Sequence, residues 1–317
     1  MSAILSRVLL RPDQRIDSKL RKRLNKALLV VMFAAPGMLV FSIFLLIPVS
    51  QSVQYSRYKW NGFGEPENYQ EWGNYERLVE HKVFQGAVKH SFTIMGLSLT
   101  IQLPIAMLLA LLVGRGTLPG RRFFRMMLFI PYVFSEIVTA LIWLYVFHPR
   151  DGLANLAFDT LVPGFKPMPW LADRDVVLYA IFAVLIWKYF GFYMILYMAG
   201  LQGVPKDLEE AARVDGANWL QVLQKITLPL MGSTIRLTIF LSVLGSFQQF
   251  AIVWVMTQGG PVSSSETIAT YLYKYGIKGF NLGYGSAVAV VLFLITVVFS
   301  IGYQRMIMHQ DYMEYTS

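Results

Sequence analysis

Three ionisable side chains interrupt the long apolar stretches of this 317-residue sequence: Glu136, Lys188 and Arg236. A charge in hydrocarbon costs several kcal/mol, so each group needs a partner, a polar cavity or access to the surface. Arg236 lies about two turns inside its stretch and can extend its side chain to the headgroups. Glu136 and Lys188 fall at a similar depth, roughly 18–20 Å at 1.5 Å per residue. We therefore expect these two either to pair or to share one polar cavity, with Lys188 serving as a structural partner or as a substrate contact.

Uncharged groups that can bind a polyol occur in two of the same stretches. Tyr189, Tyr193 and Tyr197 recur at i, i+4 and i+8, so they form one stripe on a helix. Such stripes serve packing or stack against sugar rings. The segment Ser246-Phe247-Gln248-Gln249 adds hydroxyl and amide groups, which either join helices or orient a neutral ligand. The predicted substrate contacts are Lys188, Tyr189, Tyr193, Ser246, Gln248 and Gln249.

Catalytic chemistry has no support in the sequence. The four histidines are scattered, and we find no paired acidic motif and no nucleophile constellation. Cysteine is absent from the composition, which removes disulfides and thiolate metal sites. We predict no catalytic residue, no metal site and no cofactor in this chain, which argues against a polytopic membrane enzyme.

The elements that must position these groups are membrane-spanning helices. The sequence is 55% hydrophobic with a mean hydropathy of +0.48, which is typical of a polytopic membrane protein. A bilayer core of about 30 Å needs about 20 apolar residues per helix. We predict an all-α fold with a basic N-terminal segment over 1–26 and a transmembrane domain over 27–317. The six predicted spans are 27–50, 90–114, 123–147, 176–201, 230–256 and 283–304.

Charge alternates between the segments that join the spans. Taken together, the N-terminus, the 115–122 turn with Arg125, the loop 203–229 and the C-terminus hold 16 Lys and Arg against 8 Asp and Glu, whereas the other three loops together hold 10 against 10. The positive-inside rule then places both termini and the 203–229 loop in the cytoplasm. The net charge of +9 is therefore a topology signal and gives no support for nucleic-acid binding. Residues 17–26 are expected to form a basic helix against anionic lipid headgroups.

The loop 203–229 reads as a short helix-turn-helix at the membrane surface. Pro205 suits a helix start, and acids follow in the first turns, where they complement the helix dipole. Small residues on one side allow a partner surface to approach closely. Gly216 permits a backbone bend, and Asp215 is expected to cap a second helix that runs from Ala217. The alternative is an ordinary amphipathic loop on the bilayer.

The residues of this loop resemble the EAA signature of membrane subunits of binding-protein-dependent ABC importers. The matching runs are EAA at 210–212, DGA at 215–217 and ITLP at 226–229. The MTQGGP run at 256–261 and the YLYKYGIKGFNLGYGSAVA run at 271–289 resemble stretches of sugar-type permeases. The resemblance implies a coupling helix that docks on a cytoplasmic ATPase through Glu210, Ala211, Ala212, Asp215, Gly216 and Ala217.

The resemblance also implies the fold, the location, the substrate class and the partner subunits. It predicts a type I ABC importer permease fold in the bacterial inner membrane and a sugar or sugar derivative as the substrate. The implied partners are a second homologous permease that forms a heterodimer, an ATPase dimer that carries ATP and Mg, and an extracytoplasmic binding protein. The sequence itself has no phosphate-binding loop of the GxxxxGKS or GxxxxGKT form. The competing interpretation is an ion-gradient-driven secondary transporter with Glu136 as its proton site. Neutral, acidic and phosphorylated substrates all remain open.

Overall fold

The computed structural model describes residues 12–114 and 120–308 and falls into two compact units, residues 1–54 and 55–317. The first unit is a long helix formed by α2 (Pro12–Phe41), the π-helical turn η1 (Ser42–Leu46) and the start of α3 (Ile47–Tyr55). Its apolar side chains from Leu28 onward are largely exposed, as expected of a helix that faces lipid. Residues 1–11 and 309–317, which hold part of the predicted basic segment and the C-terminus, lie outside the described residues, as do residues 115–119 of the predicted basic turn.

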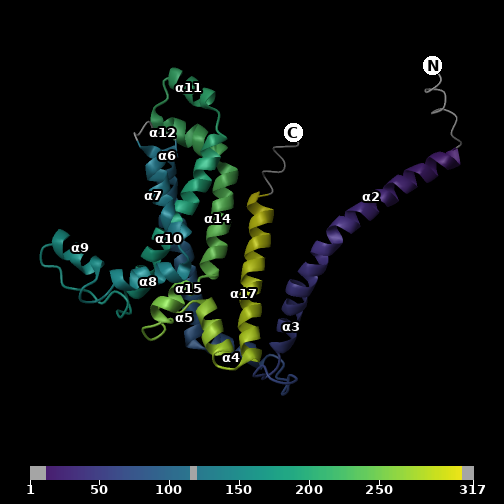
Figure 1. Cartoon of the computed structure of the whole chain (residues 1–317), viewed down its shortest axis with the longest axis horizontal. Coiled ribbons are helices and arrows are strands. Elements are labelled where there is room, and N and C mark those ends of the chain that lie inside the picture. Colours follow the sequence, from purple (N-terminus) through teal and green to yellow (C-terminus); the bar gives the residue numbers. More distant parts are fainter. Residues whose placement is uncertain (1–11, 115–119, 309–317) are drawn as a thin grey trace. The chain divides into compact units, whose positions relative to one another are not determined.

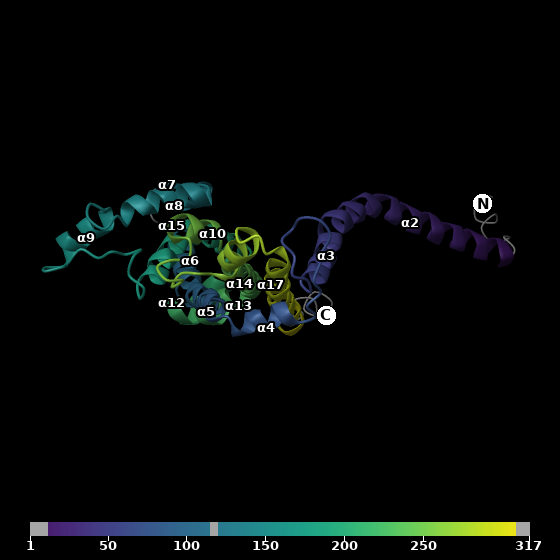
Figure 2. The ribbon, with the colours of Figure 1, turned by 90° about the horizontal axis from the view of Figure 1, so that it is seen from below.

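The second unit is helical, and its long helices run side by side (Figure 1). Helix α11 lies at one end of this unit and α4 at the other, while α9 projects away from α10 and α14 (Figures 1 and 2). The helices are α4 (Gly73–Glu80), α5 (Lys82–Leu97), η2 (Ser98–Gln102), α6 (Leu103–Gly114), α7 (Arg121–Val133), α8 (Glu136–Val146), α9 (Leu153–Leu161), α10 (Val177–Gln202), α11 (Lys206–Val214), α12 (Trp219–Val222), η3 (Leu223–Thr227), α13 (Leu228–Leu230), α14 (Gly232–Phe247), α15 (Ala251–Thr257), α16 (Ile268–Tyr271), η4 (Leu272–Ile277), α17 (Leu282–Tyr303) and η5 (Gln304–Met308).

The predicted all-α membrane fold is confirmed, with differences in individual spans. Five helical stretches in the described part are long and apolar enough to cross a bilayer, and a sixth exists only if a bent pair counts as one span. That pair is α7 with α8, predicted as one span over 123–147 and bent by 100° in the structure. The span predicted at 90–114 starts earlier, so that the helical stretch covers Lys82–Gly114. Composition identified the apolar segments but carried no signal for the direction of the chain at the bend.

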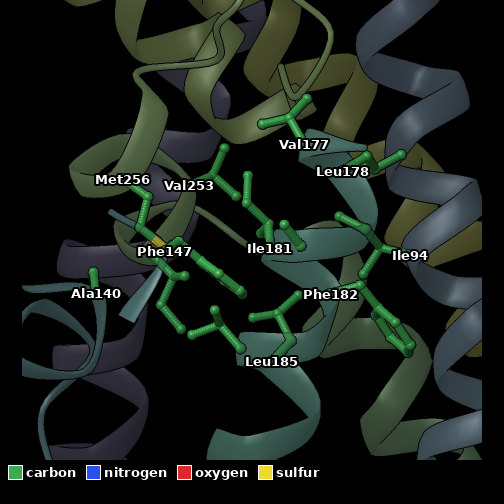
Figure 3. Close-up of a cluster of buried hydrophobic side chains, with 13 residues drawn as sticks. Ile94, Ala140, Phe147, Val177, Leu178, Ile181, Phe182, Leu185, Val253 and Met256 are labelled. Atoms are coloured by element: carbon green, nitrogen blue, oxygen red, sulfur yellow. The ribbon is translucent and has the colours of Figure 1, made fainter. Parts of the chain in front are cut away.

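The bent helix α8 is held by a buried apolar cluster at the side of α10. Phe147 at the end of α8 lies among Ile181 and Leu185 of α10 and Val253 of α15 (Figure 3). Burial of such side chains gives roughly 1.5–3 kcal/mol each by area transfer. In a bilayer, where lipid is also apolar, the gain comes instead from close packing. A second cluster joins α6 to α10, and a third joins α4 and α5 to α14 and α17.

The segment between α15 and α17 folds over a buried carboxylate. Glu266 is fully buried, and its Oε2 lies 3.1 Å from Lys274 Nζ. His90 Nδ1 lies 2.9 Å from the backbone oxygen of Glu266. Nearby, the Tyr271 hydroxyl lies 2.7 Å from His81 Nδ1, and burial raises the pKa of that hydroxyl. These contacts fix the return of the chain toward α17.

We predict that Gly191→Ala destabilises the protein, because α7 and α10 touch backbone to backbone at this glycine. A Cβ at Gly191 would lie 2.3 Å from the backbone oxygen of Leu128. The resulting overpacking costs about 1–3 kcal/mol, more than the gain of about 1 kcal/mol in helix propensity. The measurement is the thermal unfolding midpoint of the purified protein.

Gly96→Ala is the matched control, because it is also helical and nothing lies within 4 Å of the place that the added methyl group would take. Its midpoint should stay equal or rise. Equal behaviour of the two variants would contradict the close approach of α7 to α10.

Candidate functional site

The bend between α7 and α8 leaves non-helical backbone within a membrane span. Helix α7 ends at Val133, two residues after Pro131, whose ring removes a donor and disturbs the preceding turn. The Ser135 side chain accepts from the backbone N–H of Val138 and so caps α8. Non-helical backbone at this depth is tolerated only where protein or a water-filled cavity satisfies its polar groups. The bend therefore requires partners from a neighbouring helix.

Lys188 of α10 supplies those partners on the α7 side. Its ammonium group donates to the carbonyl oxygens of Pro131 (3.4 Å), Tyr132 (2.8 Å) and Phe134. An ammonium group has three donors, and three carbonyls receive them. A cation also complements the negative end of the α7 dipole. Only 4% of Lys188 is exposed, so it acts as a buried cap of the interrupted helix.

Glu136 stabilises the start of α8, on the other side of the bend. It lies in the first turn of α8, where a carboxylate complements the positive end of the helix. Its Oε1 accepts a hydrogen bond from the hydroxyl of Tyr189, the residue after Lys188. Of the two arrangements predicted for Glu136 and Lys188, the direct ion pair is not formed within the described residues, because Glu136 is bonded to Tyr189 and Lys188 to backbone carbonyls. The two residues serve opposite sides of one bend, because the break separates the helix ends that each of them complements.

A second interruption lies in the span predicted at 230–256. Helix α14 ends at Phe247 and α15 begins at Ala251, so Gln249 lies in the gap. The Thr267 hydroxyl donates to the backbone oxygen of Gln249 at 2.7 Å. The side-chain Oε1 of Gln249 is buried and has no hydrogen-bond partner within the described residues. This amide oxygen is thus available to a donor from a bound molecule.

A third irregularity lies in the span that starts at α5. The π-helical turn η2 places Ser98 and Gln102 on one side, where the Ser98 hydroxyl donates to Gln102 Oε1. The Ser242 hydroxyl of α14 donates to Ser98 Oγ at 2.9 Å. π-helical turns inside α-helices are frequent at functional sites. Here the turn joins its own polar groups to Ser242 of α14.

These irregular segments surround a cavity of about 200 Å³. Its wall combines hydroxyls, amides and aromatic faces with a few aliphatic groups. In the described part of the chain, the lining contains no ionisable acid or base other than tyrosine hydroxyls. The lining residues are Ile94, Ser98, Gln102, Tyr132, Leu185, Tyr189, Phe192, Tyr193, Leu241, Ser242, Gly245, Ser246 and Gln249.

The cavity brings together four of the six predicted substrate contacts: Tyr189, Tyr193, Ser246 and Gln249. Gln248 is exposed and absent from the wall, because the chain turns at the end of α14. Lys188 also lies outside the wall, because its ammonium group is turned toward the carbonyls of α7. The Tyr197 hydroxyl accepts from Thr238 and likewise lies away from the cavity.

Sequence reasoning missed several polar residues of the wall, chiefly Ser98, Gln102, Tyr132 and Ser242. A usable signal existed, because Ser98 and Gln102 are spaced i, i+4 within an apolar stretch. Ser242, Ser246 and Gln249 follow at i, i+4 and i+7 on another stretch. Polar side chains on matching faces of two spans indicate a shared interior site.

The predicted helix-turn-helix over 203–229 is present at the end of the second unit that carries α11 (Figure 1). Gly216 has a φ of +88° and so makes the turn that the sequence predicted. The cap of the second helix was predicted wrongly, because Asn218 forms a capping box with Gln221 while Asp215 ends α11. The Thr227 hydroxyl donates to Glu209 Oε1 at 2.7 Å and ties the two helices together.

The same loop presents an apolar surface. Val214 is 87% exposed, and Leu208, Trp219 and Leu220 are each about half exposed or more. Such side chains on a loop outside the predicted spans indicate a contact surface for another molecule. Of the residues predicted to couple to the ATPase, Glu210, Ala211, Asp215 and Gly216 are exposed, and Ala212 and Ala217 are partly exposed.

Comparison with known proteins places this architecture in a family. Residues 102–307 match the model of the binding-protein-dependent transport system inner membrane component, so the chain belongs to that family. It is therefore a multi-pass inner-membrane transport subunit, and ATP hydrolysis resides in a separate subunit of such importers. This family membership favours the importer over the gradient-driven alternative.

Individual relatives cover nearly the whole chain. The sulfoquinovosyl glycerol transport system permease protein SmoG of Agrobacterium fabrum is 30% identical, over 94% of this chain and 98% of its own length. The diacetylchitobiose uptake system permease protein NgcF of Streptomyces coelicolor is 29% identical, over 84% of this chain and 79% of its own. A chain of a crystallised bacterial alginate ABC transporter has the same fold, with a TM-score of 0.76 and 24% identity over 91% of this chain and 96% of its own.

We predict that Lys188→Met destabilises the protein, because it leaves three buried carbonyls without donors. Each buried group that loses its partner costs about 1–3 kcal/mol. The thermal unfolding midpoint of the purified protein should fall markedly. Lys89→Met, at an exposed lysine on α5, should leave it nearly unchanged. An unchanged midpoint for both variants would contradict the role of Lys188 as a cap.

Proposed function

We propose that this chain is the permease subunit that moves a sugar or sugar derivative through the cavity between α5, α10 and α14. The observation that carries this proposal is the cavity wall of hydroxyls, amides and aromatic faces within interrupted spans. Carriers commonly place their substrate sites where helices are broken near the middle of the bilayer. Tyr189, Tyr193, Ser246 and Gln249 are the proposed substrate contacts. The relatives named for glycosides and an oligosaccharide support the same class of substrate.

We propose further that α11 is the coupling helix, with the 203–229 loop and both termini in the cytoplasm. The exposed apolar side chains of the loop and its hydrogen-bonded hairpin support a docking role. The partner is a dimer of ATPase subunits that holds ATP and Mg. Because one chain offers one such loop to a dimeric ATPase, a second permease subunit completes the pore.

The opposite end of the second unit is the proposed side for the substrate-binding protein. A hollow of about 750 Å³ lies there, lined by the 59–70 loop and by Gly279, Phe280 and Asn281. Its position away from α11 supports delivery of the solute from the extracytoplasmic side (Figure 1). The similar alginate transporter was crystallised in complex with a periplasmic protein that carries an alginate pentasaccharide.

We predict that Gly216→Val uncouples ATP hydrolysis from transport. Gly216 needs its φ of +88°, which a β-branched residue adopts only with strain. The strain reshapes the turn and displaces α11 from its docking partner. Uptake by the complete complex should fall by at least about ten-fold, equivalent to about 1.4 kcal/mol in coupling. The measurements are solute uptake, stimulation of ATPase activity by the loaded binding protein, and the amount of inserted chain.

Gly164→Val is the matched control. Gly164 also has a positive φ of +81°, and nothing lies within 4 Å of the position of its missing Cβ, as at Gly216. It lies in the loop between α9 and α10, away from α11. The control should insert and transport like the wild type. Normal stimulation and uptake by the Gly216 variant would show that the loop is only a surface hairpin.

A further inference from the structure

We infer that the cavity selects an uncharged, hydroxyl-rich solute against an anionic one of the same size, an inference that rests on the proposed function. The named relatives do not settle this point, because their names include both a sulfonated and an uncharged solute. The choice follows from three features of this chain: the neutral wall, the withdrawal of Lys188, and an unpartnered acceptor at Gln249.

The wall offers an anion no opposite charge. Its polar groups are the hydroxyls of serine and tyrosine and the amides of Gln102 and Gln249. A buried anion without a cation or several converging donors pays a large desolvation cost. An uncharged sugar avoids this cost, because its hydroxyls exchange hydrogen bonds with such groups. Its C–H faces can pack on Tyr193 and Phe192, whose rings lie edge to face with centroids 5.3 Å apart.

Lys188 is not among the wall residues, although its ammonium group lies 5.4 Å from the centre of the Tyr132 ring. All three of its donors are directed to backbone carbonyls of the bend. Turning it toward a solute would leave those carbonyls buried without donors, at a cost comparable to the gain. Glu136 lies behind the wall, bonded to Tyr189, which lines the cavity. The Lys188 ammonium group lies 5.9 Å from the centre of the Tyr189 ring, so the opposite charges of Glu136 and Lys188 behind the wall offset each other and leave an anion without a net opposite charge.

The side-chain oxygen of Gln249 requires a hydrogen-bond donor from the solute. Its buried Oε1 has no partner within the described residues and belongs to the cavity wall. A buried acceptor is satisfied only by a donor, and a fully ionised sulfonate or phosphate has none to offer. A sugar hydroxyl donates and also accepts. A solute should therefore bind more tightly in the cavity when a hydroxyl replaces its anionic group.

The test compares two solutes that differ at one position. Glucosylglycerol carries a hydroxyl where sulfoquinovosyl glycerol carries a sulfonate. Binding is measured by saturation-transfer NMR on the complete transporter in nanodiscs without its binding protein, whose own selectivity would otherwise mask that of the cavity. We expect the neutral probe to bind at least about ten-fold more tightly. Gln249→Leu should weaken neutral binding about ten-fold, whereas Gln248→Leu, its exposed neighbour, should not.

Gln249→Lys provides the converse variant, since it adds a cation to the wall and should improve sulfonate binding. Equal or tighter binding of the sulfonate by the wild type would overturn selection of neutral solutes. If that binding still depended on Gln249, the proposed transport site would stand. If substitution of Gln249 changes the binding of neither probe, or if neither probe binds, the cavity is not the transport site. ATP-driven uptake in the same preparation would then separate loss of the site from loss of the importer function.

Discussion

The hydrogen bonds from Lys188 to the carbonyls at the end of α7 are the interaction on which the rest of the second unit depends. They make a 100° bend within a membrane span tolerable, because the polar backbone that the bend frees has donors. The neighbouring Tyr189 bonds Glu136 on the other side of the bend. Two consecutive residues of α10 thereby fix the end of one helix and the start of the next. A cation and a carboxylate that suggested an ion pair act instead as two helix-end partners.

The site follows from how three spans are interrupted. The bend after α7 brings Tyr132 to the wall, the gap between α14 and α15 brings Gln249, and the π-helical turn η2 brings Ser98 and Gln102. Each interruption has its own hydrogen-bond partner in a neighbouring element, such as Thr267 for the backbone of Gln249. Side chains that would pack between straight helices are thus separated by a cavity. Irregular backbone is costly because it leaves polar groups unpaired, and the hydrogen-bonding groups that shape the site offset this cost.

Much of the fold could be predicted from sequence, because apolar length and charge alternation are local properties. The turn at Gly216 and the helices around it could also be predicted, since a positive φ favours glycine. The cap at Asn218 was missed because Asp215 and Asn218 are both competent caps and only backbone geometry separates them. The orientation of Lys188 and Gln248 depends on where the helices break, which is a tertiary property. Glu266 escaped notice for the same reason, since its burial depends on the fold of the segment after α15.

We propose that ATP, acting through α11, drives solute through this chain. The most direct test of this proposal is uptake into proteoliposomes that contain the complete complex and the loaded binding protein, with the proton gradient dissipated by an ionophore. We expect that uptake requires ATP on the side of α11, persists with the ionophore and survives Glu136→Gln in any complex that still assembles. Uptake that follows an imposed proton gradient without ATP, and that Glu136→Gln abolishes, would contradict the account and support a gradient-driven carrier.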